Sequence, residues 1–241
     1  MRNAIVFLTY QPNTELIKFA NRFNSPNLVP YICIDDSNYN TNNIKVKTIQ
    51  YSYDECSSKG FIGLILPFTL QNTYRPCAWD KAMYHFCVKD TSFDNVYFVE
   101  DDVLIKSPLE IYNIEKTYPK ADLICSSHIS FKMDPFWPHW IICHDLHDKL
   151  LYHSMMCICR LSKKLLNNIL NFAEKHGKLC YHECFFNVLA ADNNYIIENP
   201  FEFKNITWNT NWNLIDFKLG LLYHPVKNVE IHKLIHGKYN F

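Results

Sequence analysis

The first half of the chain alternates between short apolar runs and a helical pattern. Residues 4–8 and 27–34 are apolar runs of strand length, and residues 45–51 alternate apolar and polar side chains as a half-exposed strand does. Between the first two runs, residues 13–14 can cap a helix that we expect over residues 15–23. This β-α-β-β order predicts a nucleotide-binding half of the Rossmann type.

A second helix and a buried strand follow. Pro76 is well placed in the first turn of a helix. Its expected core face comprises Ala78, Trp79, Ala82, Met83 and Phe86. Its other side is expected to carry Asp80, Lys81, Tyr84 and His85. Residues 96–99 are then uninterruptedly apolar, which indicates a strand buried on both faces.

Three acids, Glu100, Asp101 and Asp102, come directly after this strand. A sheet interior cannot hold three ionised carboxylates without partners, so the chain must leave the core here. The carboxyl ends of strands are where open α/β sheets bind ligands, and adjacent oxygen ligands suit a divalent cation that holds phosphates. The alternative is a solvated acidic turn, which the strictly apolar run before the acids disfavours.

The second half of the chain has a different order. Strands are expected at residues 121–125 and 154–159, and helices at residues 160–176 and 183–191. The long segment 131–147 between the two strands is rich in aromatic residues, proline and histidine, and is expected to be a loop. Because no repeat or linker interrupts the chain, we expect a single domain.

The composition argues against several classes of protein. The 24 Lys and Arg residues balance the 24 Asp and Glu residues, which disfavours a nucleic-acid binder that needs a broad basic surface. The first apolar run is too short for a signal peptide, and no run reaches the length of a membrane span. We therefore expect a cytoplasmic protein. The abundance of Asn, Lys, Ile and Tyr is typical of an AT-biased source such as a virus, in which case the location is the host cytoplasm.

The ten cysteines are expected to be reduced, since several lie in apolar runs and no secretion signal is present. A zinc site is the alternative, because Cys157 and Cys159 together with Cys180, His182 and Cys184 supply enough ligands. Their i, i+2 spacing differs from the usual two-residue gaps of zinc motifs. We therefore do not expect zinc at these residues.

In their order, these elements resemble the GT-A glycosyltransferases. The resemblance rests on the nucleotide-binding half, the acidic motif, Glu183 at the start of a helix and His224 near the C-terminus. It implies an α/β fold with a Rossmann-like mixed central sheet flanked by helices. Within one domain, residues 1–106 would bind the nucleotide sugar and residues 107–241 the acceptor.

The resemblance implies a metal site. Asp102 is expected to ligate Mn²⁺ or Mg²⁺ and His224 to complete the site, while Glu100 and Asp101 contact the ribose or a metal-bound water. Lys227 is expected to reach a phosphate. The cation would neutralise the charge that builds on the leaving nucleotide diphosphate, and we expect the donor to be a UDP-sugar. The alternative for His224 is a surface histidine before a turn-forming proline.

The resemblance also implies a catalytic base. Glu183 matches the carboxylate that takes the proton of the acceptor hydroxyl in an inverting transfer. Members of the family often have two acids here, whereas His182 and Cys184 flank Glu183, so Asp145 and Asp148 are reserve candidates. The alternative for Glu183 is a first-turn acid that the helix dipole favours.

Nucleotide contacts are expected where the first two strands end and around the helix before the acidic motif. The candidates are Thr9, Tyr10, Asp35, Asp36, Arg75 and Lys81. The acceptor is expected on the aromatic segments, since tryptophan faces can stack on sugar rings. These candidates are Trp137, Trp140, Trp208 and Trp212, with His139 and Asp134 as hydrogen-bond partners. The alternatives are plain surface positions for the first set and core filling for the second.

Together these expectations describe a metal-dependent glycosyltransferase that moves a sugar to a glycan or other hydroxyl acceptor. Two rival functions stay open. A sugar nucleotidyltransferase usually carries a glycine-rich basic loop after its first strand, and residues 9–12 hold no such loop. A non-catalytic nucleotide- or carbohydrate-binding protein could keep the same fold.

Overall fold

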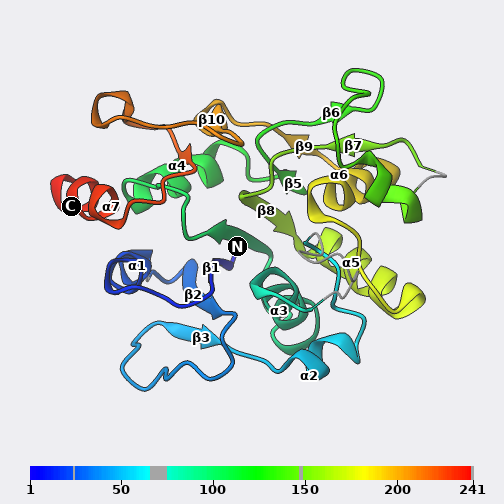
Figure 1. Cartoon of the computed structure of the whole chain (residues 1–241), viewed down its shortest axis with the longest axis horizontal. Coiled ribbons are helices and arrows are strands. Elements are labelled where there is room, and N and C mark those ends of the chain that lie inside the picture. Colours follow the sequence, from blue (N-terminus) through cyan, green and yellow to red (C-terminus); the bar gives the residue numbers. More distant parts are fainter. Residues whose placement is uncertain (24, 66–74, 147–148, 240–241) are drawn as a thin grey trace.

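A seven-stranded sheet in the order β3-β2-β1-β4-β8-β5-β9 forms the centre of the molecule (Figure 1). The computed structural model describes residues 1–23, 25–65, 75–146 and 149–239. The strands of this sheet are β1 (Asn3–Thr9), β2 (Leu28–Ile34), β3 (Lys47–Ile49), β4 (Asn95–Glu100), β5 (Leu123–Ile124), β8 (Ile158–Ser162) and β9 (Ile197–Glu198). Two further pairs are β6 (Ile129–Ser130) with β7 (Tyr152–His153), and β10 (Asn205–Ile206) with β11 (Tyr223–His224).

The strand directions confirm the predicted mixed sheet. Strands β1 to β4 run parallel to one another, whereas β8 lies antiparallel to both β4 and β5. Strand β9 then pairs parallel with β5. The parallel half therefore comes from the first part of the chain, where the β-α-β-β pattern predicted it.

Helices cover both faces of the sheet. Along β1, Val6 and Leu8 pack into a core with α3, α5 and α6, while the intervening Ile5 and Phe7 pack on the other face against α1 and α4. Burial on both faces explains why these strands read as continuous apolar runs. The helices are α1 (Thr14–Ala20), α2 (Tyr53–Ser57), α3 (Ala78–Tyr84), α4 (Pro108–Thr117), α5 (Lys163–His176), α6 (His182–Asp192) and α7 (Val229–Lys238). Among the described residues, no helix has the length and apolar character that a membrane crossing requires.

Shorter helical segments complete the fold. The 3₁₀ helices are Asn21–Phe23, Trp140–Leu146, Phe201–Phe203 and Leu214–Asp216. A π-helical turn at His85–Lys89 continues α3. The segment predicted as a plain loop at residues 131–147 thus contains one 3₁₀ helix.

The position of Arg160 corrects the predicted boundary between a strand and a helix. The pattern places Arg160 at the start of a helix, but it lies in β8, and α5 begins only at Lys163. Its guanidinium is fully buried and its Nη1 lies 2.7 Å from Glu115 Oε1 of α4. A second nitrogen donates to the carbonyl of Ala121. These partners let a charged residue occupy a central strand.

Helix α3 is buried all round, on the side outside its expected core face as well. Asp80, Lys81 and Tyr84 are as buried as the expected core face. Asp80 accepts hydrogen bonds from the backbone of Leu64 and Cys77. Buried polar groups are tolerated when they are hydrogen-bonded, and a pattern based on hydrophobicity alone does not reveal such partners.

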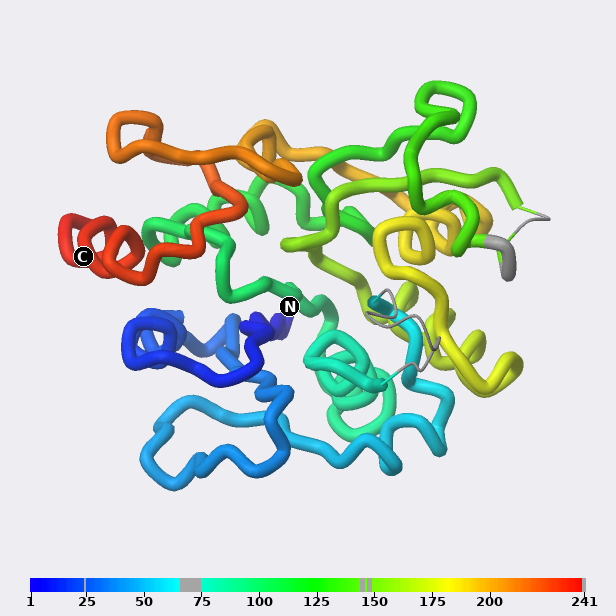
Figure 2. The backbone as a smooth tube through the Cα atoms, in the orientation of Figure 1, coloured from blue at the N-terminus to red at the C-terminus, as the bar shows by residue number. Residues whose placement is uncertain are grey.

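The C-terminal helix α7 was not predicted. It lies beside α1, as the red and blue segments of Figure 2 show. The His236 ring stacks on Phe19 with ring centroids 3.8 Å apart. Its Nδ1 lies 2.7 Å from Glu15 Oε1. The end of the chain is therefore packed against its beginning.

Lys106 is a buried cation between the acidic motif and the C-terminal strand. Its side chain is fully buried and its Nζ has no hydrogen-bond partner among the described residues. The Nζ lies 5.3 Å from the centroid of the Tyr223 ring. Burial lowers the pKa of Lys106 to about 8.

Replacing Lys106 with Met should raise the free energy of unfolding at pH 7, by on the order of 1–3 kcal/mol, because the buried charge is removed. The pKa of a lysine in the unfolded chain is about 10.4. The wild type therefore regains stability as pH rises from about 8 towards that value, and the advantage of Lys106→Met should shrink. Urea unfolding at pH 7 and pH 9.5 measures the difference. Exposed Lys175→Met is the control, and an advantage that stays constant with pH would contradict the assignment.

Candidate active site

The ends of β1, β2 and β4 meet at one edge of the sheet. Leu8 is paired with Glu100 in the β1–β4 register, so Thr9 lies next to Asp101. The Thr9 hydroxyl donates to Asp101 Oδ2 at 2.5 Å. Burial raises the pKa of Asp101, and this hydrogen bond acts against the rise. The strand register and the Thr9 hydrogen bond therefore fix the acidic motif at the carboxyl end of the parallel strands, where open α/β sheets bind ligands.

The acidic motif lies against the C-terminal strand. Leu104 and Tyr223 exchange backbone hydrogen bonds of 2.8 and 3.2 Å, and the Val226 N–H donates to the Asp102 carbonyl at 2.7 Å. His224 lies between these contacts. Its Nε2 is 3.2 Å from Asp102 Oδ1 and 3.9 Å from Glu100 Oε2. The structure thus brings both end residues of the motif, and not Asp102 alone, to the predicted histidine.

The Nδ1 of His224 lies 2.7 Å from the Thr207 carbonyl. Because a carbonyl only accepts, Nδ1 must carry the proton and Nε2 is left with its lone pair in the neutral ring. Burial by itself lowers the pKa of His224, but the hydrogen bond and charge of Asp102, with the Thr207 contact, raise it overall. In the neutral ring, Nε2 is therefore aimed at the two carboxylates as a ligand atom would be.

Trp79 has a second role beside its predicted place in the core. It is buried, and its indole N–H donates to Glu100 Oε1 at 2.8 Å. Burial raises the pKa of Glu100, the Trp79 hydrogen bond lowers it, and the charge of Asp102 raises it again. Glu100 is thus held in one orientation at the end of β4. A core-type pattern on the sequence does not reveal this contact.

The side chains around His224 fit a divalent cation. The Cys157 Sγ, a carboxylate oxygen of Glu100 and a ring nitrogen of His224 lie within 4.8 Å of one another. With Asp102 Oδ1 beside the same histidine, the site offers oxygen and nitrogen ligands of the kind that Mn²⁺ accepts. The sequence places Cys157 only in a set of possible zinc ligands that its spacing disfavours, and gives no signal that it lies beside Glu100. Among the described residues, only this group gathers three such ligand atoms.

Glu183 lies on the same cleft as the acidic motif. The cleft has a volume of about 770 Å³ and is lined by Glu183, Glu100, Asp102 and His224, among others. Glu183 is the first-turn acid of α6 and is only 6% exposed. Burial raises the pKa of Glu183 to about 7; a hydrogen bond with Tyr181 lowers it, and the charge of Glu100 raises it. A carboxyl group with such a pKa can exchange protons near neutral pH.

A smaller pocket of about 230 Å³ lies at the ends of β1 and β2. Thr9, Tyr10, Asp35 and Asp101 are among its lining residues, and the Tyr10 side chain is 65% exposed. The structure therefore gathers three of the predicted nucleotide contacts beside the acidic motif. Asp36 lies next to this group, where its carboxylate accepts from Gln11 at 2.6 Å.

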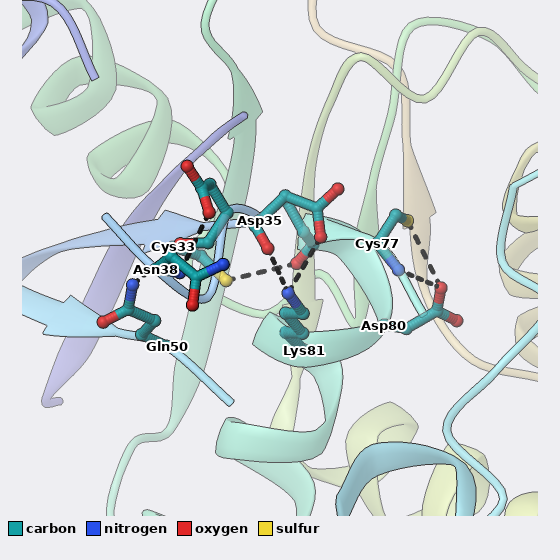
Figure 3. Close-up of polar contacts among 9 residues, drawn as sticks. Cys33, Asp35, Asn38, Gln50, Cys77, Asp80 and Lys81 are labelled. Carbon is teal, nitrogen blue, oxygen red and sulfur yellow. Dashed lines mark hydrogen bonds and ion pairs between the residues drawn. The ribbon is translucent and has the colours of Figure 1, made fainter. Parts of the chain in front are cut away.

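Lys81 does not face this pocket. Its ammonium is buried and lies 2.9 Å from Asp35 Oδ1, and it also donates to the Asp35 carbonyl (Figure 3). This placement departs from the expected contact with a diphosphate, because the buried ammonium uses two of its three N–H groups to hold Asp35 at the end of β2. Lys81 is therefore a positioning residue for Asp35.

The other predicted cations and acids lie in different surroundings. Lys227 lines the large cleft beside His224. Arg75 is exposed, lies 5.1 Å from the Tyr53 ring centroid and is not among the described lining residues. Asp145 falls in the 3₁₀ helix Trp140–Leu146, and its side chain lies outside the described part of the structure, as does Asp148.

The aromatic candidates separate into two groups. Trp208 and Trp212 line the large cleft, with Asn209, Thr210 and Asn211 between them. Trp208 is 73% exposed. By contrast, Trp137 and Trp140 pack against the central core and each other, and are not among the described residues that line the cleft. His139 and Asp134 belong to this second group, since His139 contacts Trp137 and Asp134 pairs with His153.

The structure is similar in fold to solved glycosyltransferases. No family model and no curated protein matches the sequence. The galactosyltransferase LgtC in complex with donor and acceptor sugar analogues has a TM-score of 0.51 and 10% identity, over 98% of this chain and 95% of that chain. An active-site mutant of LgtC has a TM-score of 0.51 and 9% identity over the same shares. Mouse xyloside xylosyltransferase 1, in its apo form, has a TM-score of 0.41 and 10% identity over 82% of this chain and 84% of that chain.

The likeness to LgtC spans almost the whole of both chains. At this identity it shows the fold. The predicted GT-A-like fold, a mixed sheet flanked by helices in a single domain, is confirmed.

Glu183 should make the stability of the protein depend on pH. Its pKa is about 7 in the folded protein and about 4.3 in an unfolded chain, so the protonated carboxyl stabilises the fold below pH 4.3 and this contribution is lost as pH rises to 7. Glu183→Gln stays neutral and keeps the shape. Its stability relative to wild type should rise from pH 4 to pH 8 by on the order of 2–3 kcal/mol. Denaturant unfolding at both pH values measures this, with exposed Glu174→Gln as control; an unchanged difference would contradict it.

Proposed function

We propose that this protein is a divalent-metal-dependent glycosyltransferase that takes a sugar from a UDP-sugar and transfers it to a hydroxyl group of a glycan. One observation carries the proposal: His224 Nε2 faces Glu100 and Asp102 at the end of β4, on the cleft that also contains Glu183. The fold supports it, because LgtC binds donor and acceptor sugar analogues on the same architecture.

The donor would lie across the edge of the sheet. Tyr10, exposed beside the small pocket, offers a ring face to the nucleotide base, and Asp35 accepts hydrogen bonds from it or from the ribose. Asp102 and His224, with Glu100, would hold Mn²⁺ or Mg²⁺, which when bound supplies positive charge to the diphosphate. Lys227 adds a point charge at the same end of the cleft.

The acceptor would occupy the large cleft. Its hydroxyl group approaches the sugar from the side of Glu183, and the Glu183 carboxylate takes the hydroxyl proton. The environment of Glu183 suits this work, because its burial brings the pKa to about 7. We propose an inverting displacement with Glu183 as the base, and Asp145 and Asp148 as the reserve candidates.

We also propose a cytoplasmic location, the host cytoplasm if the source is a virus. Cys33, Cys125 and Cys159 are fully buried thiols of the core rather than disulfide partners. Such cysteines are typical of a reducing compartment.

Replacing Asp102 with Ala should lower kcat/KM for a UDP-sugar by about 100-fold or more, because the metal loses a ligand next to the diphosphate. The measurement is release of UDP from a panel of UDP-sugars with Mn²⁺ or with a chelator. Asp192→Asn, at the exposed far end of α6, is the matched control and should keep wild-type activity.

Other outcomes of this assay would contradict the metal assignment or indicate a different function. Equal rates in wild type and Asp102→Ala would contradict the metal assignment. Formation of UTP from a UDP-sugar only when pyrophosphate is added would identify a sugar nucleotidyltransferase. Nucleotide binding without turnover of any donor would identify a non-catalytic binding protein.

Replacing Trp208 with Ala should raise KM for a glycan acceptor by about tenfold and leave KM for the donor almost unchanged. The physical reason is that an exposed indole face at the cleft can stack on a sugar ring, which contributes on the order of 1 kcal/mol. Initial rates at varied acceptor concentration measure it. Phe136→Ala removes an aromatic ring that is 92% exposed and outside the described lining of the cleft, and serves as control. A rise in the donor KM alone would contradict the assignment.

A further inference from the structure

Cys157 places a thiol beside the candidate metal ligands. It comes directly before β8, and its carbonyl accepts from the Glu100 N–H at 2.8 Å, so the backbone holds it next to the end of β4. Its side chain is 5% exposed and lines the large cleft. Its thiol is also hydrogen-bonded to the Glu100 carboxylate. A soft ligand is therefore fixed at a site whose other ligands are oxygen and nitrogen.

His224 is shared between two sets of ligands. Its Nε2 lies 3.2 Å from Asp102 Oδ1, which with Glu100 makes a set of oxygen and nitrogen ligands. A ring nitrogen of His224 also lies within 4.8 Å of both the Cys157 Sγ and a Glu100 oxygen, which makes a set that includes sulfur. Mn²⁺ and Mg²⁺ prefer oxygen and nitrogen ligands, whereas Zn²⁺, Co²⁺ and Cd²⁺ also accept thiolate. The two sets therefore suit different metals, and one histidine cannot serve both metals at once.

We propose that Glu100, Cys157 and His224 form a binding site for a thiophilic divalent cation, Zn²⁺ in the first place. Zinc ligated by one sulfur, one nitrogen and one oxygen needs ligand atoms about 3.3–3.6 Å apart, given zinc–ligand lengths of about 2.0–2.3 Å. The His224 Nε2–Glu100 Oε2 separation of 3.9 Å is close to this requirement. The three ligand atoms lie within 4.8 Å of one another, so side-chain rotations that bring them closer would complete the geometry. The Cys157 proton leaves to solvent as the sulfur–metal bond forms.

Zinc at this site would exclude Mn²⁺ from His224. The consequence for turnover depends on the proposed glycosyltransferase function, in which His224 serves the catalytic metal. Metal binding itself needs neither a sugar donor nor turnover. A spectroscopic measurement therefore separates a failure of the zinc site from a failure of the proposed function.

The experiment is a titration of the full-length, metal-free protein with Co²⁺, which replaces zinc and gives a near-ultraviolet sulfur-to-metal charge-transfer band when a thiolate binds. We expect the band in wild type and its loss in Cys157→Ser. Zn²⁺ should displace Co²⁺ and remove the band. The affinity for Zn²⁺, measured by competition with a chromophoric chelator, should fall by about 100-fold in Cys157→Ser, and that for Mn²⁺ by much less.

Two variants control for the other thiols. Cys159→Ser changes a fully buried thiol two residues away, and Cys184→Ser changes a buried thiol that is hydrogen-bonded to Cys143. Both should keep the band. If either loses it and Cys157→Ser keeps it, the site lies elsewhere and the proposal is overturned.

A measurement on the wild-type protein tests the zinc site without relying on a variant that has to fold. X-ray absorption at the zinc edge should show one sulfur among the ligands of Zn²⁺. Zero sulfur ligands, or two, would overturn the proposal. Equal losses of Zn²⁺ and Mn²⁺ affinity in Cys157→Ser would also overturn it, because the thiol would then only support the fold of the site.

Discussion

The candidate site depends on backbone hydrogen bonds between two segments that are distant in the sequence. Leu104 and Tyr223 exchange N–H···O=C bonds, and Val226 N–H donates to the Asp102 carbonyl at 2.7 Å. Because these bonds fix the register of β11 against the acidic motif, His224 must lie beside Asp102. The Thr207 carbonyl then sets the orientation of the imidazole. A slip of one residue would turn His224 to the opposite face and leave the carboxylates without it.

The acidic motif and the sheet around it could be predicted from the sequence, because residues 96–99 are all apolar and the three residues that follow are all acidic. An apolar run followed by three acids favours the end of a buried strand over a solvated acidic turn. The β-α-β-β pattern gave the parallel half correctly, since parallel strands buried on both faces are apolar throughout. The gathering of Glu183 and His224 on one cleft also agrees with the order of motifs along the chain.

What could not be predicted depends on partners that are far apart in the sequence. Arg160 lies in a central strand because Glu115 neutralises it, and Lys81 is buried because Asp35 meets it. Cys157 reaches the acidic motif only through the antiparallel pairing of β4 with β8. Helix α4 is a different case, since Ser107 and Glu110 form a capping box around Pro108. The sequence therefore carried a local signal for the start of α4. The helix was not predicted because its apolar positions do not form a clear stripe.

The carboxyl groups at the site raise one another's pKa values, although His224 acts against this rise. Burial raises the pKa of Glu100 and of Glu183, the charge of Asp102 raises that of Glu100 further, and the charge of Glu100 raises that of Glu183. Two buried lysines do not relieve this, since Lys81 is paired with Asp35 and Lys106 lies over the Tyr223 ring, whereas Lys227 lines the cleft. Although the formal net charge of the whole chain is zero, the carboxyl groups of Glu100, Asp101 and Asp102 concentrate negative charge at the end of β4. A divalent cation would stabilise the ionised forms of these carboxyl groups. In the proposed function, this local negative charge is what would give the site affinity for a metal and, through the metal, for a diphosphate.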